Sequence, residues 1–269
     1  MVSLAKLAVM VVCILICVVA IAIPTYMIKC RSSKIETGLS GAIGYGFLGY
    51  IWQYVFWMFA VVLVSKPFVS ENKEPNVVLM QFLLTIVTTA CTAVSLYWGI
   101  YLTNQKQLSI YRSAAVGIGF SLGRMGVDLI YPYVERFYYS LQLNAGTFQG
   151  EEELRNLILE KSIPSLFAGT YRCLMMCVML FVIALIMGHY YIAGNKKMAW
   201  LSVLSIYEAI MLINMGLQFT FGQISQTVND ISFMILYTVV AAFAVLILRH
   251  WLQTGEVEWN PQKLLKKKQ

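Results

Sequence analysis

The chain has 269 residues, of which 59% are hydrophobic and only 12% are charged, and its mean hydropathy is +0.70. Soluble domains average roughly 25% charged residues, so this composition excludes a soluble globular protein and indicates a multi-pass inner-membrane protein. The net charge of +7 comes from basic residues in short loops and in the C-terminal tail. This distribution suits membrane topology and anionic headgroups, so we expect the lipid bilayer and not nucleic acid as the partner.

Seven stretches are apolar and long enough to cross a bilayer, which requires about 20 residues. In chain order they are residues 4–28, 39–64, 76–101, 113–139, 162–191, 198–217 and 232–250. The first stretch is too long for a signal peptide, so we expect it to be retained as an anchor. Residues 150–161 begin with glutamates and continue in an amphipathic pattern, which predicts a short helix at the membrane surface. The sequence therefore predicts an all-α bundle over residues 1–250 and a basic cytoplasmic tail over residues 251–269.

The lysine and arginine residues predict the orientation of this bundle. Loops on one side are more than twofold richer in basic residues than loops on the other, and they include Lys29, Arg112 and Lys196 together with the tail. The richer side is expected to face the cytoplasm. With seven spans, the N-terminus then lies outside and the C-terminus lies in the cytoplasm.

The fourth span is the most informative segment, because it carries charge within an apolar run, AVGIGFSLGRMGVDLIYPYVE over residues 115–135. On a continuous helix with about 100° per residue, one stripe collects polar and ionisable positions. These positions are Gly117, Ser121, Arg124, Asp128, Tyr131 and Glu135. The opposite side carries Ala115 and the glycines Gly119, Gly123 and Gly126, which we expect to allow close packing of another helix. Pro132 is expected to kink the helix or free its backbone locally.

Two further spans carry charge near the same depth, at Arg172 and at Glu208. A lone charge at the bilayer centre costs at least about 2.5–3.5 kcal/mol, so these residues are expected to pair with one another. Arg124 can pair with Asp128 along its own helix, which leaves Arg172 to pair with Glu208 unless both arginines share the carboxylates. Such a network is either structural, fixing the packing, or it lines a polar cavity that binds a ligand.

The sequence contains no recognisable catalytic constellation. Its two histidines, His189 and His250, lie at span ends, and neither HExxH nor GxSxG occurs. Cys13 and Cys17, like Cys173 and Cys177, are spaced four apart on apolar helices without a nearby histidine, so we expect buried free thiols and no metal site. No cofactor is expected, and no catalytic residue can be assigned.

The chain resembles the YhfC family of bacterial membrane proteins, which are regarded as intramembrane peptidases related to the CAAX-protease group. The resemblance rests on the initial MVS, a first span that ends in Pro24 and basic residues, a glycine-containing second span with VFW, and above all AVGIGFSLGRMGVDLI. It implies a helical bundle with a carboxylate and a histidine that activate water.

The chain departs from this family pattern at the positions that would carry catalysis. The third span reads TAVSLYWGIYL and lacks the expected pair of glutamates, and Phe120 stands where the family carries a histidine. We therefore expect a relative without peptidase activity that binds a membrane substrate, a partner subunit or a second copy of itself. The alternatives are an active peptidase with a non-standard site and a transporter or permease subunit, in which Arg124 and Arg172 attract an anionic solute.

Overall fold

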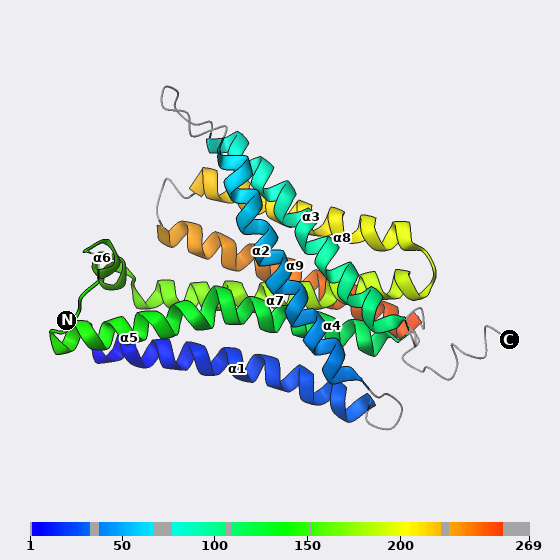
Figure 1. The fold of residues 1–269 in the computed structure, drawn as a ribbon, viewed down its shortest axis with the longest axis horizontal. Helices are drawn as coiled ribbons and strands as arrows, with labels where there is room; N and C mark the ends of the chain where they lie inside the picture. The colour runs from blue at the N-terminus through cyan, green and yellow to red at the C-terminus, as the bar shows by residue number, and fades with distance from the viewer. Residues whose placement is uncertain are drawn as a thin grey trace.

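The computed structural model describes residues 2–32, 38–66, 77–105, 109–150, 152–221 and 226–254. Within these ranges the regular elements are all helical (Figure 1). They are α1 (Leu4–Ser32), α2 (Leu39–Ser65), α3 (Val77–Asn104), α4 (Ile110–Met125), the π-helical turn η1 (Gly126–Ile130), α5 (Tyr131–Ala145), α6 (Glu152–Glu160), α7 (Ile163–Ile192), α8 (Lys196–Phe221) and α9 (Gln226–Thr254).

The helices confirm a multi-pass membrane bundle. Six stretches of the described chain are long and apolar enough to cross a bilayer, namely Leu4–Tyr26, Leu39–Val64, Val78–Asn104, Ile110–Ala145, Ile163–Ile192 and Lys196–Leu217. Helix α9 has 29 residues, about 43 Å at 1.5 Å per residue, although its described apolar stretch is shorter, Asp230–Phe243. The seven predicted spans thus correspond to α1, α2, α3, the continuous α4–η1–α5 rod, α7, α8 and α9, and α6 is the predicted short helix. The predicted tail lies outside the described residues, except where its first residues continue α9.

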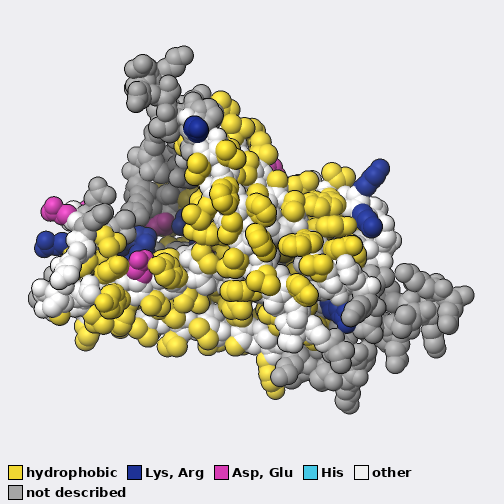
Figure 2. Space-filling model, in the orientation of Figure 1, with side chains coloured by type: hydrophobic (Ala, Val, Ile, Leu, Met, Phe, Trp, Pro, Cys, Tyr) yellow, Lys and Arg dark blue, Asp and Glu magenta, His cyan; other side chains and the backbone are white. Residues whose placement is uncertain are grey.

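The outer surface has the character expected against lipid. Figure 2 shows hydrophobic side chains covering the middle of the molecule, with basic side chains towards its ends. Among the exposed apolar residues are Phe59 and Leu63 of α2, with 66% and 72% of their surface accessible. Exposure on this scale is unfavourable in water but not in the hydrocarbon of a bilayer.

The long helices alternate in direction along the bundle (Figure 1). Helix α1 begins at the end of the molecule where α6 lies, and α9 terminates at the opposite end. This arrangement agrees with an odd number of crossings. The side that faces the cytoplasm remains a prediction from the loop charges.

Helix α4 lies at the centre of the bundle, between α2 and α7. The stretches that contain α4 and α7 are 67% and 61% buried, whereas the other candidate spans are at most 22% buried. A Cβ atom at Gly119 would lie 1.9 Å from the backbone oxygen of Ile43, and one at Gly123 would lie 2.7 Å from Cβ of Tyr50. Both glycines therefore pack against α2 as predicted. Gly117 packs on the other side, where its Cβ would lie 2.8 Å from that of Ala184 in α7.

Gly126 does not serve as a packing glycine, contrary to the prediction. A Cβ atom there would meet nothing within 4 Å. Gly126 is the first residue of the η1 turn, so the close approach of α2 to the rod ends before this turn begins.

The η1 turn also corrects the predicted polar stripe. The backbone N–H of Tyr131 donates to the carbonyl of Gly126, five residues back, so the turn holds one more residue than an α-helical turn. Pro132 follows directly, and because it has no N–H and its ring crowds the carbonyl four residues earlier, it favours such a break. Tyr131 consequently points outwards and is 65% exposed. The positions one residue later, Pro132 and Arg136, face the interior cavity in place of Tyr131 and Glu135.

Helix α6 is fastened to the start of α1. The Nζ atom of Lys6 donates to the carbonyls of Ile158 at 2.6 Å and Leu159 at 3.1 Å, at the C-terminal end of α6. A cation there satisfies carbonyls that have no partner within the helix. This attachment fixes the short connection that carries Lys161 beside the start of α7.

Candidate binding site

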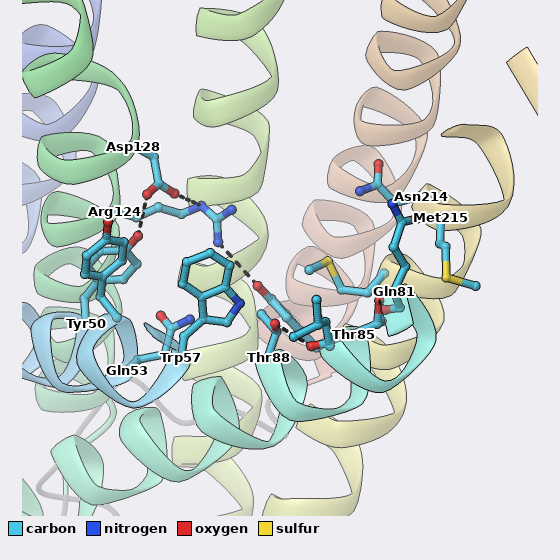
Figure 3. Close-up of a pocket in the computed structure, with 14 residues that line it drawn as sticks. Tyr50, Gln53, Trp57, Gln81, Thr85, Thr88, Arg124, Asp128, Asn214 and Met215 are labelled. Carbon is cyan, nitrogen blue, oxygen red and sulfur yellow. Dashed lines mark hydrogen bonds and ion pairs between the residues drawn. The ribbon is translucent and has the colours of Figure 1, made fainter. Parts of the chain in front are cut away.

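An ion pair on the central rod forms the middle of the site. Nε of Arg124 lies 3.3 Å from Oδ2 of Asp128, so these residues pair along the helix as predicted. The hydroxyl of Tyr50 donates to Oδ1 of Asp128 at 2.7 Å, and Nη1 of Arg124 donates to the hydroxyl of Tyr207 at 3.3 Å (Figure 3). Because Tyr50 belongs to α2 and Tyr207 to α8, the network joins these helices to the rod.

A cavity of about 390 Å³ lies on one side of this ion pair, between α2, α3 and α8. We call it the polar cavity. Apart from Arg124 and Asp128, the described residues in its walls are uncharged, and the polar ones include Gln53, Thr85, Thr88 and Asn214. Figure 3 shows Gln53 and Thr88 near the indole of Trp57, and Asn214 on the opposite side of the cavity, beside Met215.

A second cavity, of about 370 Å³, lies between α5, α7 and α9 and is also lined by Arg124 and Asp128. We call it the basic cavity, because the other charged residues in the described part of its lining are Arg136, Lys161, Arg172 and a single acid, Asp230. In Figure 2, acidic and basic side chains gather in a recess at the left of the view, beside the hydrophobic surface.

The electrostatic environment of the basic cavity is evident at Lys161, which lies between α6 and α7. Burial lowers the pKa of this lysine, and the positive charges of Arg136 and Arg172 lower it further, while Asp230 acts in the opposite direction. The protein thus holds a cation where its own surroundings disfavour positive charge.

Arg172 reaches the basic cavity, but its predicted pairing with Glu208 does not form. Its guanidinium lies over the ring of Phe233 in α9, 5.1 Å from the centroid. Among the described residues, the only ion pair within 4.0 Å joins Arg124 and Asp128. Glu208 lines neither cavity, because α8 turns Tyr207, Met211 and Asn214 towards the polar cavity. Glu208 follows Tyr207 by one position and is therefore rotated away by about 100°.

Several lining residues were not predicted from the sequence. Gln53, Thr85 and Thr88 are uncharged, and Arg136, Lys161 and Asp230 lie near predicted span ends, where charge is common. A signal did exist for α3, because Gln81, Thr85 and Thr88 recur at helical spacing within an apolar span.

The carboxylate of Asp128 is held in place from both sides. One of its oxygens accepts from Tyr50 and the other faces Arg124. In the described part of the chain, no group of three histidine, cysteine, aspartate or glutamate residues is placed to hold a metal ion.

The cysteines whose side chains the structure describes are free thiols; Cys13, Cys17 and Cys177 are buried as expected, whereas Cys173 is half-buried in the lining of the basic cavity. His189 lies near the end of α7, far along that helix from the basic-cavity residues, and the side chain of His250 lies outside the described residues.

Comparisons with protein-family models, with curated proteins and with solved structures find no match for this chain.

Proposed function

We propose that this chain is a non-catalytic binding protein of the cell membrane, and that its basic cavity takes the acidic group of a membrane substrate or solute. In this proposal the chain keeps the layout of a YhfC-type peptidase without its chemistry. With the predicted orientation, the cavity is reached from the outer side, since its residues come from the beginning of α7 and α9.

The observation that carries the proposal is the excess of positive charge around the basic cavity. Among the described residues that line this cavity, four cations, Arg124, Arg136, Lys161 and Arg172, face two anions, Asp128 and Asp230, which leaves a net charge of +2. Asp128 is already engaged by Arg124. Unbalanced charge is costly within a membrane protein, so an anion that balances this charge would be bound favourably.

Binding of inorganic phosphate to the full-length protein in nanodiscs, measured by isothermal titration calorimetry, tests the proposal. Arg172→Gln should weaken binding by about 10-fold or more, because it removes a charge-assisted hydrogen bond. Arg155→Gln is the matched control, since Arg155 is an exposed residue of α6 that lines neither cavity. Phosphate binding that is absent, or that both variants weaken equally, would contradict the proposal.

The affinity should also depend on pH through Lys161. This lysine contributes to anion binding only while it is protonated, and its pKa lies below the usual 10.5. Phosphate affinity should therefore fall as the pH rises through this lowered pKa. In Lys161→Met the affinity should be lower at pH values below this pKa and equal to that of the unaltered protein above it, so this step in the pH dependence should be lost.

A transporter for an anionic solute is the second candidate, favoured by the two cavities that meet at Arg124 and Asp128. Counterflow into proteoliposomes separates transport from static binding. If the chain is a transporter, the proteoliposomes take up the solute, and Arg124→Gln and Arg172→Gln each reduce this uptake. A binding protein gives no counterflow. In the same preparation we expect no cleavage of membrane peptides, and reproducible cleavage abolished by Asp128→Asn would establish a peptidase instead.

A further inference from the structure

The threonines of the polar cavity present hydrogen-bond acceptors. The hydroxyl of Thr85 donates to the carbonyl of Gln81 at 2.8 Å, and that of Thr88 donates to the carbonyl of Leu84 at 2.7 Å. Each hydroxyl thus uses its only proton in a hydrogen bond to its own helix. What remains available to the cavity is the oxygen lone pairs, which can only accept.

Two amide oxygens in the same cavity lack partners. Oε1 of Gln53 and Oδ1 of Asn214 are buried, and neither has a hydrogen-bond partner within the described part of the chain. Gln53 is only 6% exposed and comes from α2, whereas Asn214 comes from α8. Because buried polar atoms in proteins are nearly always satisfied, these two oxygens indicate a missing donor in the space between the helices.

The charge and shape of the cavity restrict the donor. Of the described residues that line it, only Arg124 and Asp128 are charged, and they neutralise each other. An uncharged donor therefore fits better than an ammonium group. The rings of Tyr54 and Trp57 stack at 6.0 Å between centroids and line the same cavity, so they offer flat apolar faces.

We propose that the polar cavity binds a hydroxyl-rich ring, such as a sugar or a cyclic polyol. Its hydroxyls donate to Gln53, Asn214 and the α3 threonines, while its C–H face lies on the aromatic rings. The ring belongs to the same ligand whose acidic group enters the basic cavity, so this inference rests on the proposed function. The shared chemistry is that of a phosphorylated polyol, which occurs as a free solute or as a lipid headgroup.

Titrations of the full-length protein with three soluble probes test the inference: inorganic phosphate, myo-inositol and myo-inositol 1-phosphate. The combined probe should bind about 10-fold more tightly than phosphate, the gain expected from two additional hydrogen bonds. Gln53→Leu and Thr85→Val should each remove a substantial part of this gain and leave phosphate affinity unchanged. Gln142→Leu is the control, because Gln142 lies on α5 and lines neither cavity. The melting temperature of each variant identifies any loss of fold, and Thr85→Val preserves the side-chain shape if Gln53→Leu does not fold.

The outcomes separate this inference from the proposed function. Arg172-dependent phosphate binding without any gain from the ring would overturn the inference and leave the proposed function intact. Binding of myo-inositol that depends on Gln53, without phosphate binding, would support the polar cavity and overturn the proposed function. Equal effects of Gln53→Leu and Gln142→Leu would also overturn the inference.

The source of the ligand is tested in nanodiscs that contain either phosphatidylinositol or phosphatidic acid. Specific retention of phosphatidylinositol, reduced in Gln53→Leu, identifies a lipid headgroup. Equal retention of both lipids, together with tight binding of myo-inositol 1-phosphate, identifies a free solute.

Discussion

Gly119 is the residue at which the α2–α4 contact depends most strongly on the absence of a side chain. The position its Cβ would occupy lies 1.9 Å from the backbone oxygen of Ile43. Gly46 of α2 faces α4 in the same way, with its Cβ position 2.1 Å from the backbone oxygen of Val116. Because the obstacle in both cases is backbone, no side-chain rotation can relieve it, and the helices must move apart.

Gly119→Ala is therefore expected to destabilise the protein by about 1–3 kcal/mol or to prevent folding, as overpacking of a tight interface does. Gly126→Ala provides the contrast, since nothing lies within 4 Å of its Cβ position. This second substitution should change stability by less than about 1 kcal/mol, in either direction. Denaturant unfolding in mixed micelles measures both, and equal losses would show that the close approach of α2 and α4 is not important for stability.

At the scale of the element, the η1 turn determines which side chains reach the basic cavity. One additional residue in the turn rotates the following helix by about 100°, so Arg136 faces the cavity and Tyr131 faces outwards. A regular helix would have presented Glu135 instead. The turn thus replaces an acid by a base at the edge of the basic cavity.

Pro132→Ala tests the connection between this turn and binding. Alanine restores the missing N–H and removes the ring, so α5 can continue the regular winding of α4. We expect an unchanged or higher melting temperature but a several-fold loss of phosphate affinity, because Arg136 turns away. Unaltered affinity would mean that packing against α7 holds the turn without help from the proline.

At the scale of the molecule, the Arg124–Asp128 pair is both a structural connection and part of the lining of both cavities. The pair joins the rod to α2 through Tyr50 and to α8 through Tyr207. Its side chains are 20% and 34% exposed, so each is reachable from the cavities as well as bonded within the bundle. The two interpretations of the charged stripe, packing and binding, are therefore compatible.

Removing one member of this pair should cost more than removing both. Arg124→Gln leaves Asp128 without its cation and Asp128→Asn leaves Arg124 without its anion, whereas the double variant leaves neither charge unbalanced. The expected coupling energy is about 1–3 kcal/mol, obtained from denaturant unfolding of the single and double variants. The control is the pair of exposed residues Glu152 and Arg155 of α6. Glu152→Gln, Arg155→Gln and their double variant should give a coupling energy near zero. Additive losses at Arg124 and Asp128 would argue against the pairing.

The sequence by itself determined the helical membrane architecture and most of its boundaries. The predicted spans 39–64 and 162–191 agree with α2 (Leu39–Ser65) and α7 (Ile163–Ile192) to within one residue at each end. The agreement has a physical reason: backbone groups in a bilayer must be satisfied within their own segment, so a long apolar run can only be a helix. The Arg124–Asp128 pair was predictable for a similar reason, since it depends on a spacing within one helix.

Only the tertiary structure decided which residues the cavities bring together. The partner of Arg172 is the ring of Phe233 and not Glu208, and Tyr207, rather than its acidic neighbour, bonds to Arg124. These outcomes depend on how α8 and α9 are rotated about their own axes, and packing against neighbouring helices sets that rotation. The register after η1 likewise follows from the packing of the bundle together with Pro132. A pattern with a fixed period cannot anticipate one additional residue in a turn.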